Sequence, residues 1–154
     1  MIVRVKNFKF IVRNCLDEDY SFVYNLLKIN MHALFVKNWG GWDPNVFRDN
    51  FDKKDIKIIE YNRKRVAFYD FELKESFSYI HNIQVSASMQ RRGLGTFLLE
   101  FIEMETKRHN LRKIRLKVFK DNLARKLYLK LGYKQIKDEG SAVILEKKLS
   151  VGAE

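Results

Sequence analysis

The chain has 154 residues, 46% of them apolar and 32% charged, a balance that is typical of a globular domain and excludes a long disordered tail. This length predicts a single domain that spans residues 1–154. The net charge is +11, and residues 81–154 hold 16 basic residues against 8 acidic ones. The basic excess indicates either a solvated surface or a surface that attracts a polyanion, which would be a nucleotide cofactor or a nucleic acid.

Cysteine content and hydropathy exclude two further classes of protein. Cys15 is the only cysteine, so the chain forms no internal disulfide and fits a reducing, cytoplasmic location. No apolar run approaches the ~20 residues of a membrane-spanning helix, and the N-terminus lacks the apolar core of a signal peptide. We therefore expect no membrane partner, and we expect no metal site.

The first half of the sequence predicts a strand, two helices and an antiparallel meander of three strands. The acidic residues Asp17 to Asp19 are expected to cap the first helix, and Asp43-Pro44 the second. The strand and the two helices cover residues 8–12, 20–34 and 45–51. The strands of the meander cover residues 56–60, 65–73 and 77–85.

The second half of the sequence alternates helices with strands. Apolar spacing predicts a helix over residues 93–108 and a strand over residues 114–118. A further helix over residues 122–131 ends with Gly132 at its C′ position, and a last strand covers residues 142–149. This order of elements predicts an α/β sandwich with one central mixed sheet.

A turn with two glycines lies between the strand that ends at Val85 and the next helix. Gly93 and Gly95 allow a sharp backbone turn, which brings successive N–H groups toward one point. The helix adds its unpaired N-terminal N–H groups and the positive end of its dipole, so the turn is suited to a pyrophosphate. It is not a P-loop, because Thr96-Phe97 follows Gly95, and Leu98 replaces the third small residue of a dinucleotide-binding fingerprint.

Two blocks of sequence resemble the GNAT superfamily of N-acetyltransferases. The first is Gln90-Arg91-Arg92-Gly93-Leu94-Gly95, which directly follows Asn82-Ile83-Gln84-Val85 and resembles the acetyl-CoA signature of that superfamily. The second contains Asn122, Ala124, Leu127-Tyr128 and Leu131-Gly132-Tyr133. The chain departs from the pattern at Ala87, where Pro is usual, and at Asn122, which lies two rather than three residues before Ala124.

The resemblance implies both a fold and a cofactor. The fold would be α/β (α+β), with a central mixed, mostly antiparallel sheet of six or seven strands flanked by about four helices. The cofactor would be acetyl-CoA (coenzyme A), and its pantetheine arm would lie beside the strand at residues 83–85, with the N–H of Ile83 facing the thioester carbonyl. The expected cofactor-binding residues are Ile83, Gln84, Val85, Gln90, Arg91, Arg92, Gly93, Leu94, Gly95, Thr96, Asn122 and Tyr128.

Two residues are candidates for the proton transfers that the resemblance implies. Tyr128 holds the position where the superfamily keeps a hydroxyl near the cofactor sulfur, which makes it the candidate general acid; a core tyrosine is the alternative. His81 is similar to a histidine of the arylalkylamine N-acetyltransferases and would relay the proton of the amine through water; a structural histidine is the alternative. Ribosomal-protein N-terminal acetyltransferases, similar in the cofactor motif, have a glutamate base where this chain has Lys117. Without an obvious strong base, an amine of low pKa is favoured.

The acceptor side is expected at the N-terminal helices, where His32, Trp39 and Trp42 cluster. These residues would wall a pocket for the acceptor, or they would plug the end of the core and cap the next helix. Small uncharacterised members of the superfamily have a stretch similar to the one that holds Trp39 and Trp42, but this similarity does not identify a substrate. We expect a primary amine, on a small molecule or at a protein or peptide N-terminus, to attack directly in a ternary complex; a homodimer is left open.

Two non-enzymatic alternatives remain at this stage. A non-catalytic acyl-CoA-binding protein would keep the cofactor motif without a base. A nucleic-acid-binding protein would account for the charge, but the basic residues from Arg112 to Lys117 alternate along a strand and form no stripe with exposed aromatic residues. Nucleic acid is therefore the less favoured partner.

Overall fold

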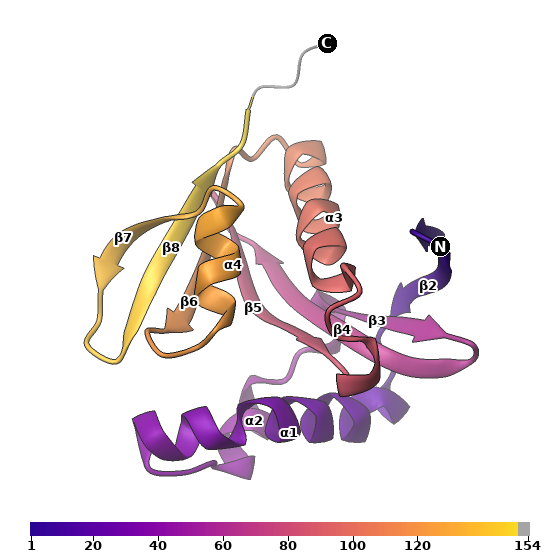
Figure 1. Ribbon diagram of the computed structural model, residues 1–154, viewed down its shortest axis with the longest axis horizontal. Coiled ribbons are helices and arrows are strands. Elements are labelled where there is room, and N and C mark those ends of the chain that lie inside the picture. Colours follow the sequence, from indigo (N-terminus) through magenta and orange to yellow (C-terminus); the bar gives the residue numbers. More distant parts are fainter. Residues whose placement is uncertain (151–154) are drawn as a thin grey trace. The chain divides into compact units, whose positions relative to one another are not determined.

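The computed structural model describes residues 1–150, with the elements labelled in Figure 1. The strands are β1 (Ile2–Val5), β2 (Phe8–Asn14), β3 (Ile56–Tyr61), β4 (Lys64–Leu73), β5 (Ser78–Val85), β6 (Lys113–Phe119), β7 (Lys134–Asp138) and β8 (Ala142–Lys148). The helices are α1 (Tyr20–Trp39), α2 (Pro44–Asn50), α3 (Leu94–Arg108) and α4 (Ala124–Lys130). Short 3-10 helices cover Asp17–Asp19, Lys53–Asp55 and Ala87–Met89.

The eight strands found within residues 1–150 form one sheet in the order β1-β2-β3-β4-β5-β6-β8-β7. β5 and β6 run in parallel, whereas β1–β2, β2–β3, β3–β4, β6–β8 and β7–β8 are antiparallel. The expected fold, a mixed and mostly antiparallel sheet with about four helices, is therefore confirmed. The expected number of six or seven strands is corrected to eight. β1 and β7 are edge strands of four and five residues without a buried side chain, and stretches this short give little periodicity in the sequence.

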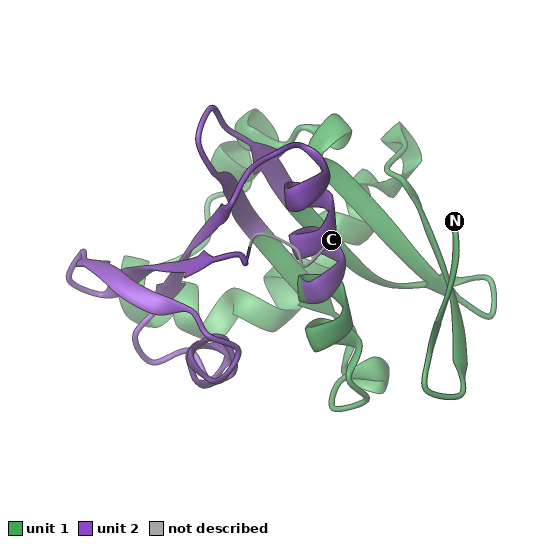
Figure 2. Ribbon diagram, turned by 90° about the horizontal axis from the view of Figure 1, so that it is seen from above, with its two compact units in different colours: residues 1–70, 82–99 green, residues 71–81, 100–154 purple. Residues whose placement is uncertain are grey.

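The chain divides into two compact units, which Figure 2 shows in different colours. Unit 1 contains residues 1–70 and 82–99, and unit 2 contains residues 71–81 and 100–154. The division falls within β4, β5 and α3. The single domain expected from the length stays a prediction.

The core of unit 1 is formed by apolar residues of β2, β3, β4 and α1. Residues 66–69 of β4 are all buried, so side chains on both faces of this strand are covered, as in the centre of a sheet. In α1, the buried side chains are Val23, Leu26, Leu27 and Phe35. The helix runs past the predicted end at residue 34 and stops before Gly40, whose positive φ of 78° suits a C-cap.

Capping residues predicted from the sequence act as expected at two helices. Asp43 Oδ1 accepts a hydrogen bond of 2.9 Å from the Asn45 N–H at the start of α2, with Pro44 in the first turn. Gly132 has a φ of 99° after α4, and the Tyr133 N–H donates to the Tyr128 carbonyl at 3.0 Å. This closure satisfies a carbonyl that the end of the helix leaves unpaired.

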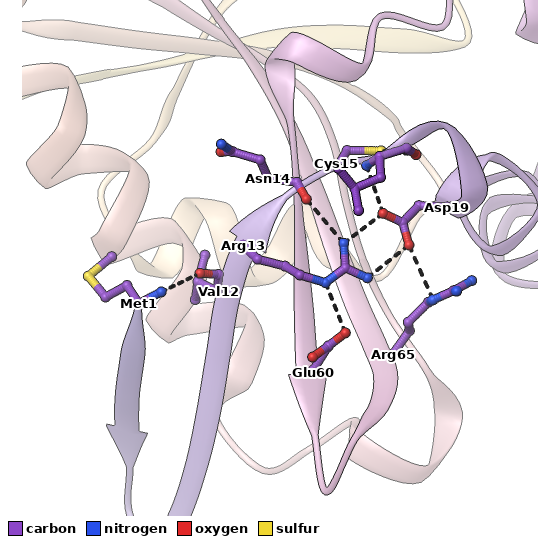
Figure 3. A network of polar contacts seen from close by, with 9 residues as sticks. Met1, Val12, Arg13, Asn14, Cys15, Asp19, Glu60 and Arg65 are labelled. Carbon is purple, nitrogen blue, oxygen red and sulfur yellow. Dashed lines mark hydrogen bonds and ion pairs between the residues drawn. The ribbon is translucent and has the colours of Figure 1, made fainter.

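Asp19 behaves differently from the helix cap that its position predicts, because it is the centre of a buried ionic network in unit 1 (Figure 3). Arg13 binds both of its carboxylate oxygens, at 2.7 and 2.9 Å, and Arg65 Nε lies 3.2 Å from Oδ1. The Leu16 N–H donates to Oδ2 at 2.8 Å, and Arg13 Nε also donates to Glu60 at 2.9 Å. The hydrogen bonds from Arg13 lower the pKa of Asp19, so the carboxylate stays charged although it is 0% exposed.

Unit 2 combines an apolar core with one buried polar pair. The buried residues Ile114, Leu116 and Val118 of β6 alternate along the strand, as expected for side chains on one face. The hydroxyls of Ser78 and Thr106 are both buried and lie 2.8 Å apart, and Thr106 also donates to the Ile102 carbonyl. Each hydroxyl thereby avoids the cost of burial without a hydrogen bond.

Two properties of the described residues concern membranes and metals. None of the helices in residues 1–150 has both the length and the apolar character that crossing a membrane requires. Over the same residues, no three His, Cys, Asp or Glu side chains gather in an arrangement suited to a metal ion.

Candidate active site

The glycine-containing turn of unit 1 has the backbone conformation that an anion site needs. β5 ends at Val85, a 3-10 helix follows at Ala87–Met89, and α3 begins at Leu94. Arg91 and Gly93 have positive φ angles of 63° and 83°, so the chain reverses sharply just before the helix. The side-chain position of Gly95 faces open space, since no heavy atom lies within 4 Å of a Cβ built there.

Unpaired backbone donors line this turn. Within the described residues, the N–H groups of residues 92–96 make no hydrogen bond, and the first helical bond is Phe97 N–H to the Gly93 carbonyl at 3.0 Å. Such donors, together with the positive end of the α3 dipole, stabilise a bound anion. The residues present therefore fit the diphosphate of the cofactor predicted from the sequence.

The end of β5 is fixed to the turn by side chains of unit 1. The Val85 carbonyl accepts hydrogen bonds from Gln90 Nε2 at 2.8 Å and from Asn30 Nδ2 at 3.1 Å. Asn30 also donates to Gln84 Oε1 at 3.1 Å. Gln90 thus fixes the end of β5 to the turn. Asn30, on α1, binds the same carbonyl and was not predicted from the sequence. Only the folded chain brings α1 to this strand.

In unit 2, His81 is paired with a carboxylate that the sequence analysis also missed. His81 Nε2 lies 3.0 Å from Glu72 Oε1, and the imidazole ring lies beside that of Tyr79 with 5.0 Å between centroids. Both side chains are partly exposed, at 41% and 37%. The hydrogen bond with His81 is the main reason why the pKa of Glu72 is lowered.

The register of the β4–β5 hairpin explains how Glu72 reaches His81. The Lys74 N–H donates to the Phe77 carbonyl at 2.8 Å, which closes the turn between the strands. Counting back from this bond places Glu72 opposite Tyr79 and diagonal to His81 on the same face, within reach of a long side chain. The sequence predicts antiparallel strands that end at residue 73 and begin again at residue 77, so the register of this short connection was the signal that could have identified Glu72.

Tyr128 and Asn122 belong to the α4 region of unit 2. Tyr128 is partly buried, and loss of solvation raises its pKa to about 12. The described residues of its own unit offer the Tyr128 hydroxyl no hydrogen-bond partner, and its ring lies 5.7 Å from that of Tyr133. Asn122 Oδ1 accepts a hydrogen bond of 2.9 Å from the Ala124 N–H, so it orders the start of α4. The expected contacts of both residues with the cofactor stay predictions.

The residues expected on the acceptor side lie in an aromatic cluster of unit 1. Trp42 Nε1 donates to the Tyr24 hydroxyl at 3.1 Å, and Phe35 lies between the two tryptophans, 4.9 Å from Trp39 and 5.0 Å from Trp42. His32 is exposed and makes no polar or ring contact within the described residues. The structure therefore brings Trp39 and Trp42 together and leaves His32 outside their contacts.

Comparison with known protein families identifies the class. Residues 23–133 match the family model described as the acetyltransferase (GNAT) family. This range covers more than half of the chain and includes the turn at residues 90–96, His81 and Tyr128. The chain belongs to the acetyltransferase (GNAT) family, and it is an acyltransferase, as the sequence predicted.

Solved structures share the fold at low sequence identity. A PaiA N-acetyltransferase from Thermoplasma acidophilum in complex with coenzyme A is 18% identical, with a TM-score of 0.71 over 90% of this chain and 98% of that chain. The ribosomal-protein-S18-alanine N-acetyltransferase from Escherichia coli is 21% identical, with a TM-score of 0.70 over 94% and 97%. A GNAT family acetyltransferase from Elizabethkingia anophelis with acetyl-CoA bound is 16% identical, with a TM-score of 0.69 over 91% and 98%. At these identities the likeness shows the fold that the chain shares with these acetyltransferases.

The conformation of Gly93 leads to a first testable prediction. In Gly93→Val, a β-branched residue would have to adopt a φ of 83°, which strains the turn and displaces its N–H donors. We expect the affinity for acetyl-CoA, measured by isothermal titration, to fall at least about tenfold. Gly140→Val is the matched control, because Gly140 has a similar φ of 92° but lies in the β7–β8 turn. Equal affinities of the two variants would remove the turn from the cofactor site.

Proposed function

We propose that the chain transfers the acetyl group of acetyl-CoA to a primary amine, which attacks the thioester directly in a ternary complex. Family membership and the unpaired donors of the turn at residues 92–96 support the cofactor half of this proposal. The hydrogen bond between His81 and Glu72 is the observation that carries the amine half, because an attacking amine must lose a proton. The acceptor would be a small-molecule amine or a protein or peptide N-terminus.

The orientation of the imidazole defines the atom that accepts the proton. A carboxylate that faces Nε2 favours the tautomer with its hydrogen on Nε2, which leaves the lone pair of Nδ1 free. In this proposal, His81 Nδ1 takes the proton of the amine through water, and Glu72 stabilises the imidazolium that forms. In the part of the proposal that follows from the resemblance, the Ile83 N–H donates to the carbonyl oxygen of the acetyl group.

The pKa of the amine determines the free energy needed to deprotonate it before it can attack. At pH 7, a lysine-like amine with a pKa near 10.4 needs about 4.6 kcal/mol to become neutral, whereas an α-amine near 8 needs about 1.4 kcal/mol. A partly exposed histidine is better suited to accept a proton from an α-amine than from a lysine-like amine. Lys117, in the slot where related enzymes have a glutamate base, forms an ion pair of 3.1 Å with Glu139 and supplies no base of its own. We therefore favour acceptors with a low amine pKa.

The test is thiol release from acetyl-CoA against a panel of amines: polyamines, aminoglycosides, arylalkylamines, amino acids and peptide N-termini. With an active amine, His81→Gln should lower kcat/KM about 30-fold and abolish the rise of activity between acidic and neutral pH. Glu72→Gln should lower kcat several-fold, because the imidazolium that forms during the reaction loses its counter-charge.

The control is His109→Gln in the same unit, an exposed histidine bound to the Glu105 carbonyl at 3.0 Å. It should leave the pH profile unchanged. If His81→Gln keeps the wild-type profile, the histidine has no role in proton transfer. If no amine releases thiol although acetyl-CoA binds, the chain is a non-catalytic acyl-CoA-binding protein.

Ion pairs argue against nucleic acid as the partner. Arg115 of β6 lies 2.7 Å from Glu146 and Lys117 lies 3.1 Å from Glu139, so acidic neighbours neutralise basic residues that the charge count had made available. A cytoplasmic location stays part of the proposal. It is supported by the single cysteine of the sequence, Cys15, which is typical of a reducing compartment.

A further inference from the structure

The N-terminal hairpin of unit 1 ends in a turn that lies against the phosphate-binding turn. β1 and β2 pair from Ile2↔Ile11 to Val5↔Phe8, which leaves Lys6 and Asn7 as a two-residue turn. The Lys6 Cε and Nζ atoms lie 3.6 and 3.8 Å from the place where a Cβ would stand on Gly93. The ammonium group of Lys6 is thus a neighbour of the backbone that carries the unpaired N–H donors.

A second contact joins the hairpin to the same turn. The guanidinium carbon of Arg92 lies 5.2 Å from the centroid of the Phe8 ring, a cation–π geometry. Phe8 itself packs against Tyr61, with 5.4 Å between ring centroids, so it gives Arg92 a fixed support. At the other end of the hairpin, the terminal amine of Met1 donates to the Val12 carbonyl at 2.8 Å (Figure 3). The hairpin is therefore anchored at both ends.

Three basic side chains lie in the turn or next to it. Within the described residues, none of Lys6, Arg91 and Arg92 forms an ion pair with an acidic side chain. This differs from Arg115, Lys117 and Lys120 of unit 2, which each have an acidic partner within 3.1 Å. Cations without a carboxylate partner, next to unpaired N–H donors, produce a local positive potential that suits a polyanion.

We propose that the ammonium group of Lys6 binds the diphosphate of coenzyme A, so that the N-terminal hairpin is part of the cofactor site. This inference rests on acetyl-CoA being the cofactor in the proposed function. The hairpin turn adds a positive charge that reaches the diphosphate from outside the loop between β5 and α3. The backbone donors of that loop fix the position of the diphosphate, and Lys6 neutralises part of its charge.

The test measures binding, with no acceptor amine present. Isothermal titration of coenzyme A at low ionic strength should give a dissociation constant about fivefold higher for Lys6→Met than for the wild type. The difference should shrink as salt is raised, because a partly exposed charge pair is screened. Lys6→Gly should show the same loss; its backbone φ of 55° suits glycine, so the folded hairpin is kept. Thermal unfolding checks that each variant is folded.

Two controls make the result specific. Lys9→Met removes a charge from the same hairpin, at a residue of β2 that pairs with Arg4, and should bind coenzyme A like the wild type. Dephospho-coenzyme A lacks the 3′-phosphate and keeps the diphosphate, so the loss in Lys6→Met should be the same with this ligand. A loss that disappears with dephospho-coenzyme A would overturn the assignment to the diphosphate.

Unchanged affinity in both Lys6 variants would overturn the inference and leave the proposed function intact. Failure of the wild type to bind coenzyme A would instead overturn the proposed function, and the inference with it. The two failures are therefore distinguishable by a single series of titrations.

Discussion

Asp19→Asn should lower the free energy of unfolding by about 3 to 5 kcal/mol, because it leaves two arginines without their shared buried partner. Asp19 is 0% exposed and is held by Arg13 at 2.7 Å and Arg65 at 3.2 Å. Asparagine has nearly the same shape, so the loss reports the charge rather than a cavity. Urea unfolding of wild type and variant at pH 7 measures the difference directly.

The control for this substitution lies two residues earlier. Asp17 forms an ion pair of 2.8 Å with Lys53, but its side chain is 87% exposed, so Asp17→Asn should change stability by less than about 1 kcal/mol. A similar loss of stability in both variants would show that the acidic residues before α1 act through the helix dipole. The buried network would then add no stability of its own.

The network also predicts the direction of the acid response. The pKa of Asp19 is lower in the folded chain than the ordinary value of about 3.9, so the unfolded chain binds the proton first as pH falls. The stabilisation is therefore complete above about pH 4 and is lost as pH falls through the lowered folded-state value. The stability gap between wild type and Asp19→Asn should close over that acidic range and stay constant between pH 5 and 7.

Local chemistry made some parts of the fold predictable from the sequence. Asp43-Pro44 and Gly132 act on the backbone within a few residues of themselves, and both end or begin helices where expected. The edge strands β1 and β7 were missed because pairing with a neighbour, and not burial, holds them in the sheet. The helix α1 was predicted too short because its last turns carry apolar residues on an exposed side, such as Val36 and Trp39.

The residues of the candidate site also fall into two groups, those predicted from local sequence and those whose positions depend on the fold. The turn at residues 90–96 follows from glycine spacing and the start of a helix, which lie within one short stretch of sequence. Asn30 and Lys6 reach the end of β5 and the turn from a helix and a hairpin of unit 1, and Glu72 reaches His81 from the neighbouring strand of unit 2. Their places depend on registers that no single segment contains. Of the three, Glu72 was the nearest to prediction, because only one short turn separates its strand from that of His81.

Tyr128→Phe should lower kcat about 100-fold while leaving the affinity for acetyl-CoA within about threefold. The proposed role of Tyr128 is to donate a hydrogen bond to the departing sulfur, and its hydroxyl has no competing partner within its own unit. Tyr133→Phe is the matched control, because the Tyr133 hydroxyl also has no hydrogen-bond partner among the described residues but belongs to the residue after Gly132. It should leave kcat unchanged. Equal rates for wild type and Tyr128→Phe would remove Tyr128 from the reaction.

The pKa of Tyr128 determines what the pH profile should look like at its alkaline end. An ordinary tyrosine would lose its proton near pH 10 and give a falling limb there, but burial raises the pKa of Tyr128 to about 12. The hydroxyl therefore keeps its proton at neutral pH, and any falling limb that Tyr128 causes should lie above pH 10. Complete transfer of its proton to a thiolate with an ordinary pKa of about 8.5 would cost roughly 5 kcal/mol, so the hydrogen bond itself must carry the effect. A limb near pH 10 that Tyr128→Phe abolishes would contradict this, since it would mean that the pKa of Tyr128 is not raised.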